Sequence, residues 1–111
     1  MKRAGVLGER IVKNFLKKLG FNILKTNLWF KRYGEIDIIA EKNKTYYFIE
    51  VKTLKWNENF DPSLHYTKRK RDKFHNLVNY YSNKNNIKEF KTILATVKLG
   101  NKIKIRFYKN V

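Results

Sequence analysis

Two carboxylates and a lysine interrupt stretches of sequence that otherwise read as buried strands. Asp37 breaks the apolar run 36–40, and Glu50 lies between apolar neighbours just before Lys52. A carboxylate in a buried strand is costly unless it is paired or binds a metal. Because side chains alternate along a strand, Glu50 and Lys52 share one face. The spacing therefore predicts a site built from Asp37, Glu50 and Lys52.

Such a site has the chemistry of metal-assisted phosphodiester hydrolysis. The carboxylates of Asp37 and Glu50, with the backbone carbonyl of Val51, supply the oxygen ligands that Mg²⁺ or Mn²⁺ takes. A bound cation would acidify a water and offset charge on the attacked phosphate. Lys52 would orient the water or stabilise the phosphate. The alternative is structural: each carboxylate forms an ion pair with one of the many lysines.

Glu9 is a further candidate, in the expected first helix beside Arg10. A helical glutamate usually faces solvent. From that helix it could also complete the metal site, and its position alone leaves both interpretations open.

The charge predicts a polyanionic partner. Lys and Arg number 26 against 9 acidic residues, for a formal net charge of +17. We expect nucleic acid, DNA above all, either branched or single-stranded. A ribosome-associated protein, or one that binds a membrane surface, is the alternative that the charge leaves open.

Cysteine is absent, which excludes disulfides and thiolate metal sites. No apolar run approaches the roughly 18 residues that span a bilayer. We therefore expect a cytoplasmic protein with no membrane partner. An exposed sheet edge leaves a homodimer open.

The densest basic run opens the expected second helix and predicts a phosphate-binding patch. The candidate nucleic-acid-binding residues are Lys68, Arg69, Lys70, Arg71, Lys31, Arg32 and Lys55. A solvated helix face is the alternative for some of them. Four aromatic residues flank the expected hairpin and could stack on unpaired bases or belong to the core: Trp29, Phe30, Tyr33 and Trp56.

Apolar periodicity predicts the elements that position these residues. Helical spacing of Leu7, Ile11 and Phe15, followed by Leu16 and Leu19, predicts a helix over 4–19, and Thr67 is a candidate N-cap for a helix over 67–82. Strands are expected at 21–26, 36–40, 46–51, 92–97 and 102–108, with a turn at 41–45. The order predicts one domain, 1–111, of α/β class: a mixed β-sheet flanked by α-helices.

The motif Gly34-Glu35-Ile36-Asp37, followed by Glu50-Val51-Lys52, resembles the YraN family. These are small endonuclease-like proteins, similar to archaeal Holliday junction resolvases and assigned to the PD-(D/E)XK nuclease superfamily. The resemblance covers nearly the whole chain. Gly8-Glu9, Thr67 and Lys70 also match the family pattern, whereas Leu28-Trp29-Phe30 departs from it.

The resemblance implies a restriction-endonuclease-like fold and a nuclease triad of Asp37, Glu50 and Lys52, with Glu9 and Glu35 beside it. The expected function is a nucleic-acid-binding protein that acts as a Mg²⁺-dependent endonuclease on DNA. The alternative is a non-catalytic DNA- or RNA-binding module that keeps the nuclease scaffold, because a fold does not fix an activity.

Overall fold

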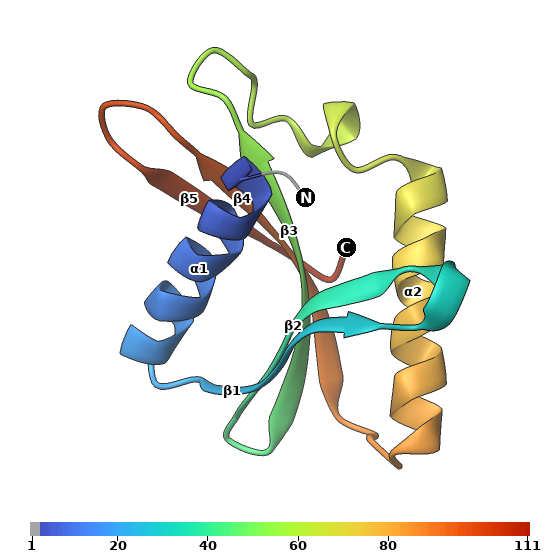
Figure 1. Ribbon diagram of the computed structural model, residues 1–111. Coiled ribbons are helices and arrows are strands. Elements are labelled where there is room, and N and C mark those ends of the chain that lie inside the picture. The colour runs from blue at the N-terminus through green and yellow to red at the C-terminus, as the bar shows by residue number, and fades with distance from the viewer. Residues whose placement is uncertain (1–2) are drawn as a thin grey trace.

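Five strands form one mixed sheet in which neighbours in the chain are also neighbours in space (Figure 1). The computed structural model describes residues 3–111, with side chains from Gly5 onward. The strands β3 and β4 are parallel, and the other neighbouring pairs are antiparallel. The elements run α1 (Arg3–Lys18), β1 (Asn22–Trp29), η1 (Lys31–Tyr33), β2 (Glu35–Lys42), β3 (Thr45–Leu54), η2 (Pro62–Leu64), α2 (Lys68–Lys84), β4 (Phe90–Lys98) and β5 (Lys104–Lys109).

Local signals in the sequence account for the main element boundaries. The β2–β3 turn places Asn43 and Lys44 at φ 52° and 66°, the left-handed conformation that a tight hairpin turn needs. The side chain of Thr67 caps α2 by accepting a hydrogen bond from the N–H of Lys70. Both the predicted hairpin and the predicted N-cap are confirmed.

The two helices cover opposite faces of the sheet. On one face, Val12 and Leu16 of α1 pack with the strand residues Ile38, Ala40 and Ile49. The other face packs against the apolar side of α2, and its buried residues are Ile36, Ile39, Phe48, Phe74, Leu77 and Val78. This arrangement confirms the predicted α/β class with a restriction-endonuclease-like mixed sheet flanked by helices.

The apolar face predicted for α1 is partly wrong. Val12 is fully buried and Leu16 nearly so, whereas Leu7 is 41% exposed and Phe15 39% exposed. Apolar residues occupy much of the circumference of α1, so packing against the sheet decides which of them is buried. Phe15 instead stacks on Phe107 of β5, with ring centroids 5.8 Å apart.

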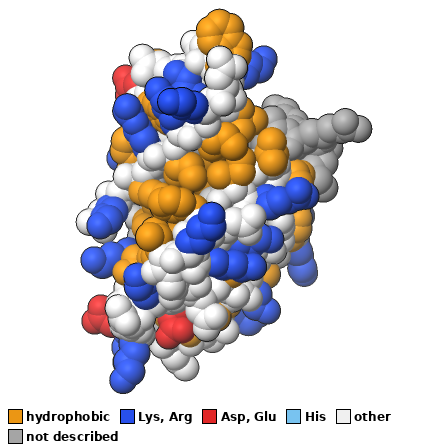
Figure 2. Space-filling model, turned by 90° about the vertical axis from the view of Figure 1, so that its left-hand side faces the viewer, with side chains coloured by type: hydrophobic (Ala, Val, Ile, Leu, Met, Phe, Trp, Pro, Cys, Tyr) orange, Lys and Arg blue, Asp and Glu red, His pale blue; other side chains and the backbone are white. Residues whose placement is uncertain are grey.

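The face formed by α1 and β5 also shows how widely the positive charge is spread. Apolar side chains gather at its centre, basic side chains surround them, and few acidic ones are visible (Figure 2). Net charge alone therefore does not locate a binding surface. No helix within residues 3–111 is long and apolar enough to cross a membrane.

The sheet splits between β2 and β3, and this split positions the candidate site. The two strands pair only from Lys42 and Thr45 to Ile38 and Ile49. Beyond that point β2 stays paired with β1 and turns toward α2, while β3 continues beside β4 (Figure 1). Asp37 and Glu50 are the next residues on the two diverging strands.

Candidate active site

Asp37 lies at the point where β2 and β3 separate. Its side chain is only 6% exposed. Its Oδ2 accepts a 2.8 Å hydrogen bond from the backbone N–H of Val51 on β3. This bond satisfies a donor left free by the end of the β2–β3 ladder, and it fixes the orientation of the carboxylate.

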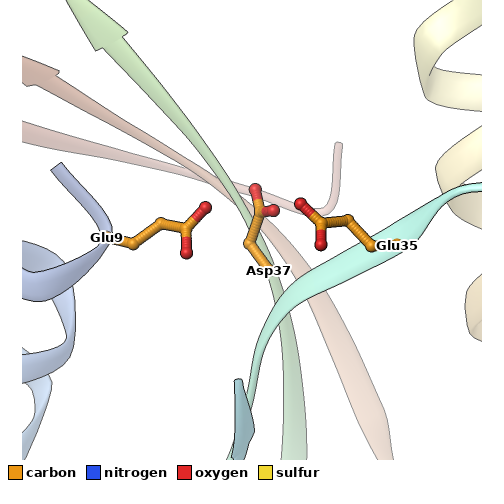
Figure 3. A group of neighbouring side chains, drawn as sticks. All are labelled: Glu9, Glu35 and Asp37. Carbon is orange, nitrogen blue, oxygen red and sulfur yellow. The ribbon is translucent and has the colours of Figure 1, made fainter. Parts of the chain in front are cut away.

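Three carboxylates converge at the split, those of Glu9, Glu35 and Asp37, and we call them the acidic group. One oxygen from each lies within 4.8 Å of the others. Glu9 reaches the group from α1, whereas Glu35 and Asp37 come from β2 (Figure 3). The structure thus brings an acidic residue of α1 together with two acidic residues of β2.

A close approach of α1 to β3 places Glu9. At Gly8, a Cβ atom would lie only 2.0 Å from Oγ1 of Thr53, so a larger residue would push the helix away from the strand. Glu9 follows directly and faces the split. The close approach therefore settles the question that the sequence left open, and Glu9 belongs to the acidic group.

Glu50 lies on β3 beside the group, on the side of the sheet that α2 covers. Its negative charge raises the pKa of Asp37, and the charges of Lys70 and Lys73 act on Glu50 itself. Tyr66 also lies on this side, packed against the apolar cluster under α2, and burial and then Glu50 raise its pKa to about 12. Its hydroxyl is buried without a hydrogen-bond partner in the described residues. Sequence reasoning missed Tyr66, which no motif marked.

The acidic group is short of compensating charge. Burial is the main cause that raises the pKa of Asp37 and of Glu50; the charge of Glu50 raises that of Asp37 further, and the charges of Glu35 and Glu9 raise both. Burial and then Glu35 raise the pKa of Glu9 as well. Ionising these carboxyls together is therefore unfavourable without a cation.

The alternative of structural ion pairs is not supported by the geometry. Among the side chains of residues 5–111, no lysine, arginine or histidine nitrogen lies within 4.0 Å of a carboxylate oxygen of Asp37 or Glu50. The one pair found there joins Lys68 to Asp72 on α2, at 2.8 Å on the surface.

The acidic group fits a small divalent cation. Mg²⁺ binds oxygens at about 2.1 Å, so ligands on opposite sides of the ion are about 4.2 Å apart. Carboxylate oxygens from Glu9, Glu35 and Asp37 within 4.8 Å of one another can meet that requirement through small side-chain rotations. Burial first and neighbouring carboxylates second raise the pKa of Asp37 and of Glu9, and such a cation would relieve both costs of ionising them.

Lys52 lies two residues after Glu50 on β3 and is half-buried. Strand alternation directs both side chains to the same face, as the sequence predicted. Among the described residues, Lys52 forms no ion pair within 4.0 Å. Its charge acts on Glu58 in the loop after β3, and the shared strand face is what relates it to Glu50.

The predicted nucleic-acid-binding residues separate into two groups. Lys31, Lys68 and Arg69 line a groove between η1 and α2, together with Lys73 and Lys84. The other four do not line that groove: Arg32, Lys55, Lys70 and Arg71.

Some of these four have partners of their own. Arg32 lies over the ring of Tyr33, 5.6 Å from its centroid, and Lys70 Nζ donates a hydrogen bond to the carbonyl of His65. The basic run at the start of α2 therefore does not act as one patch, because a helix distributes consecutive residues around its circumference.

The predicted aromatic residues also separate. Trp29 and Tyr33 line the groove and are 67% and 61% exposed. Phe30 packs edge-on against Tyr80, which sequence reasoning missed. Trp56 is 73% exposed but lies beside Gly100, away from the groove.

Comparison with known proteins gives one consistent family. The family model described as "Uncharacterised protein family UPF0102" matches residues 8–107. This match confirms the resemblance to the YraN family.

Similar proteins cover almost the whole chain. A UPF0102 protein of Aliarcobacter butzleri is 36% identical over 104 residues, which are 94% of this chain and 93% of that protein. One from Campylobacter jejuni subsp. doylei is 39% identical over 95 residues, 85% and 82% of the two chains. One from Alkaliphilus metalliredigens is 32% identical over 111 residues, 98% and 96% of the two chains.

Proposed function

The chain belongs to the uncharacterised family UPF0102, whose description assigns no activity, and we propose from its site that it is a divalent-metal-dependent endonuclease that hydrolyses phosphodiester bonds in DNA. The observation that carries this proposal is the convergence of Glu9, Glu35 and Asp37 at the split of the sheet. Asp37 is buried, Glu9 and Glu35 are half-buried, and no balancing charge pairs with them among the described residues, which is costly to a fold and supports a ligand that offsets them.

Each residue has a role that its position supports. Glu9, Glu35 and Asp37 would hold Mg²⁺ or Mn²⁺, with Glu50 beside them. A cation bound there would acidify a water and offset charge on the attacked phosphate. The N–H of Val51 keeps the Asp37 carboxylate in one orientation.

The basic residues near the acidic group would stabilise the transition state of the same reaction. Lys52 places a positive charge on the same strand face as Glu50, where negative charge builds on the phosphate during attack. The charges of Lys70 and Lys73 act on Glu50 from α2 and offset part of the rise in its pKa that burial and Glu35 cause, which favours the ionised form that a general base or ligand needs.

A cleavage assay tests the proposal. Linear duplex, single-stranded and branched DNA would be incubated with the protein in Mg²⁺, in Mn²⁺ and in EDTA. We expect metal-dependent cleavage of at least one substrate, and none by Asp37→Asn. Glu41→Gln is the matched control, because Glu41 lies on β2 at the paired end, away from the split.

The same assay separates the alternative function. A binding module on a nuclease scaffold would bind DNA and cleave no substrate with either metal. Cleavage that Asp37→Asn retains would instead reveal a contaminating nuclease and contradict the proposal.

A further inference from the structure

A groove of about 1240 Å³ runs between the β1–β2 connection and α2. Figure 1 shows the β1–β2 arm reaching across α2, with η1 between its strands. The wall from the arm carries Leu28, Trp29, Phe30, Lys31 and Tyr33, and α2 supplies the opposite wall. The acidic group accounts for none of these side chains, so the groove needs its own explanation.

The lining combines positive charge with exposed aromatic rings. Five basic side chains line it: Lys31, Lys68, Arg69, Lys73 and Lys84. Its only lining carboxylate is that of Asp72, which Lys68 already pairs at 2.8 Å. The groove is thus complementary in charge to a polyanion, and its aromatic rings offer flat surfaces to planar groups.

Two of the rings are exposed and can stack on a base, Trp29 and Tyr33, the latter with Arg32 over one face at 5.6 Å from the ring centroid. Trp29 and Tyr33 are 67% and 61% exposed. Phe30, in contrast, is fixed edge-on between Tyr80 and Tyr81, at ring-centroid distances of 5.9 Å and 6.5 Å. Exposed aromatic residues beside basic ones are typical of surfaces that bind single-stranded nucleic acid.

Gly34 lies between the groove and the acidic group, next to residues of both. This residue has φ 120° and lies directly before Glu35. A Cβ atom at Gly34 would lie 2.8 Å from Cε of Lys73 and 3.5 Å from Cδ1 of Leu77, two groove residues. The side chain of Lys73 therefore connects the groove to the carboxylates, and its charge reaches Glu50.

We propose that this groove binds an unpaired strand of nucleic acid, with bases stacked on Trp29 and Tyr33 and phosphates held by the basic side chains of α2. We also infer that the bound strand passes Gly34 and reaches the carboxylates, and this part of the inference rests on the proposed nuclease function. A duplex keeps its bases stacked on one another, so it cannot use the two rings. The substrate is accordingly a single-stranded segment, alone or beside a duplex.

Fluorescence anisotropy in EDTA tests binding without cleavage. The probes are a labelled oligothymidylate of about 12 nucleotides, within the site sizes of known single-strand binders, and a duplex of the same length. Trp29→Ala and Tyr33→Ala should each weaken oligothymidylate binding about tenfold and leave duplex binding nearly unchanged. Trp56→Ala is the matched control, an exposed tryptophan outside the groove, and should change neither. Equal losses on both probes, or no loss on either, would overturn the inference.

A second measurement does not depend on alanine variants. Trp29 and Trp56 are the two tryptophans of the chain. In Trp56→Phe protein, oligothymidylate should quench the fluorescence of Trp29, because a stacked base lies against the ring. In Trp29→Phe protein the remaining Trp56 should report no change. Absence of quenching in the first, or equal quenching in both, contradicts stacking on Trp29.

The two proposals can fail separately. If oligothymidylate binds through Trp29 and Tyr33 but no substrate is cleaved with Mg²⁺ or Mn²⁺, the nuclease function is wrong and the groove inference stands. If DNA is cleaved but the Trp29 and Tyr33 variants bind single strands normally, the groove inference is wrong and the nuclease function stands.

Discussion

The backbone N–H of Val51 donates a 2.8 Å hydrogen bond to Oδ2 of Asp37, at the level where β2 and β3 cease to pair. In a continuing ladder, a backbone carbonyl of β2 would accept the hydrogen bond from this N–H of β3. After β2 has turned away, the carboxylate of Asp37 accepts it instead. The same carboxylate lies with those of Glu9 and Glu35. Asp37 therefore has one role in the fold and, under the proposed function, a second as a metal ligand, and substitutions can separate them.

Asp37→Asn should separate these functions. The amide oxygen can still accept the Val51 hydrogen bond, while one buried negative charge disappears. Without metal, we expect the variant to be as stable as the unchanged protein or more stable, because repulsion with Glu50 is lost. The unchanged protein should gain about 2.7 kcal/mol with Mg²⁺ at about 100 times its dissociation constant, and the variant should gain nearly nothing.

Thermal melting with and without Mg²⁺ measures this difference. Glu41→Gln is the control, because it removes a charge from the same strand outside the acidic group. It should keep the full response to the metal. If neither Mg²⁺ nor Mn²⁺ shifts the melting of the unchanged protein, Asp37 does not contribute to a cation site.

The metal-free protein should lose stability as the pH rises from about 5 to about 8. The ordinary pKa values of Asp37 and Glu50 are 3.8 and 4.5, and in the folded protein they are raised to about 8 and about 7. Since the folded state then holds protons that the unfolded state has released, stability falls through this window. The carboxyls with lowered pKa values, Glu58, Asp61 and Asp72, titrate below it.

Urea unfolding in EDTA across this pH range measures whether the free energy of unfolding falls as the pH rises. In Asp37→Asn the loss of stability between the two ends of the range should be clearly smaller. A stability that is flat or rises with pH in the unchanged protein would contradict a buried, uncompensated acidic group.

Lys52→Met tests the role assigned to the lysine on β3. Methionine keeps much of the apolar length of lysine but carries no charge. DNA affinity should stay nearly unchanged, because one charge among 26 basic residues adds little. The cleavage rate should fall about 10²-fold or more, as when one preorganised charge-stabilising group is lost. Single-turnover kinetics and anisotropy measure the two quantities separately.

Lys91→Met provides the control for that comparison, since Lys91 is an exposed lysine on the neighbouring strand β4. It should change neither rate nor affinity. Unfolding of Lys52→Met would instead indicate a structural ion pair with Glu50. A well-folded Lys52→Met protein with full activity would exclude the proposed role of this residue.

Local patterns in the sequence predicted most of the elements. Apolar runs rich in β-branched residues marked the strands 36–40 and 46–51, the polar stretch 41–45 marked the hairpin turn, and Thr67 marked the start of α2. These signals involve residues close together in the chain, so they can be recognised before the fold is known. The ends of strands were less well predicted: β1 continues to Trp29, three residues beyond the expected end, because its pairing with β2 extends to Glu35.

By itself, the sequence determined the order of elements, the net charge and the unusual positions of Asp37 and Glu50. The position of Glu9 in its helix left its role open, and only the family resemblance placed it beside Asp37; the tertiary structure supplies the physical reason that it lies with Glu35 and Asp37, the close approach at Gly8. The groove likewise exists only because the β1–β2 arm packs across α2. Both features join residues far apart in the chain, and periodicity within single elements carries no information about which distant surfaces will meet.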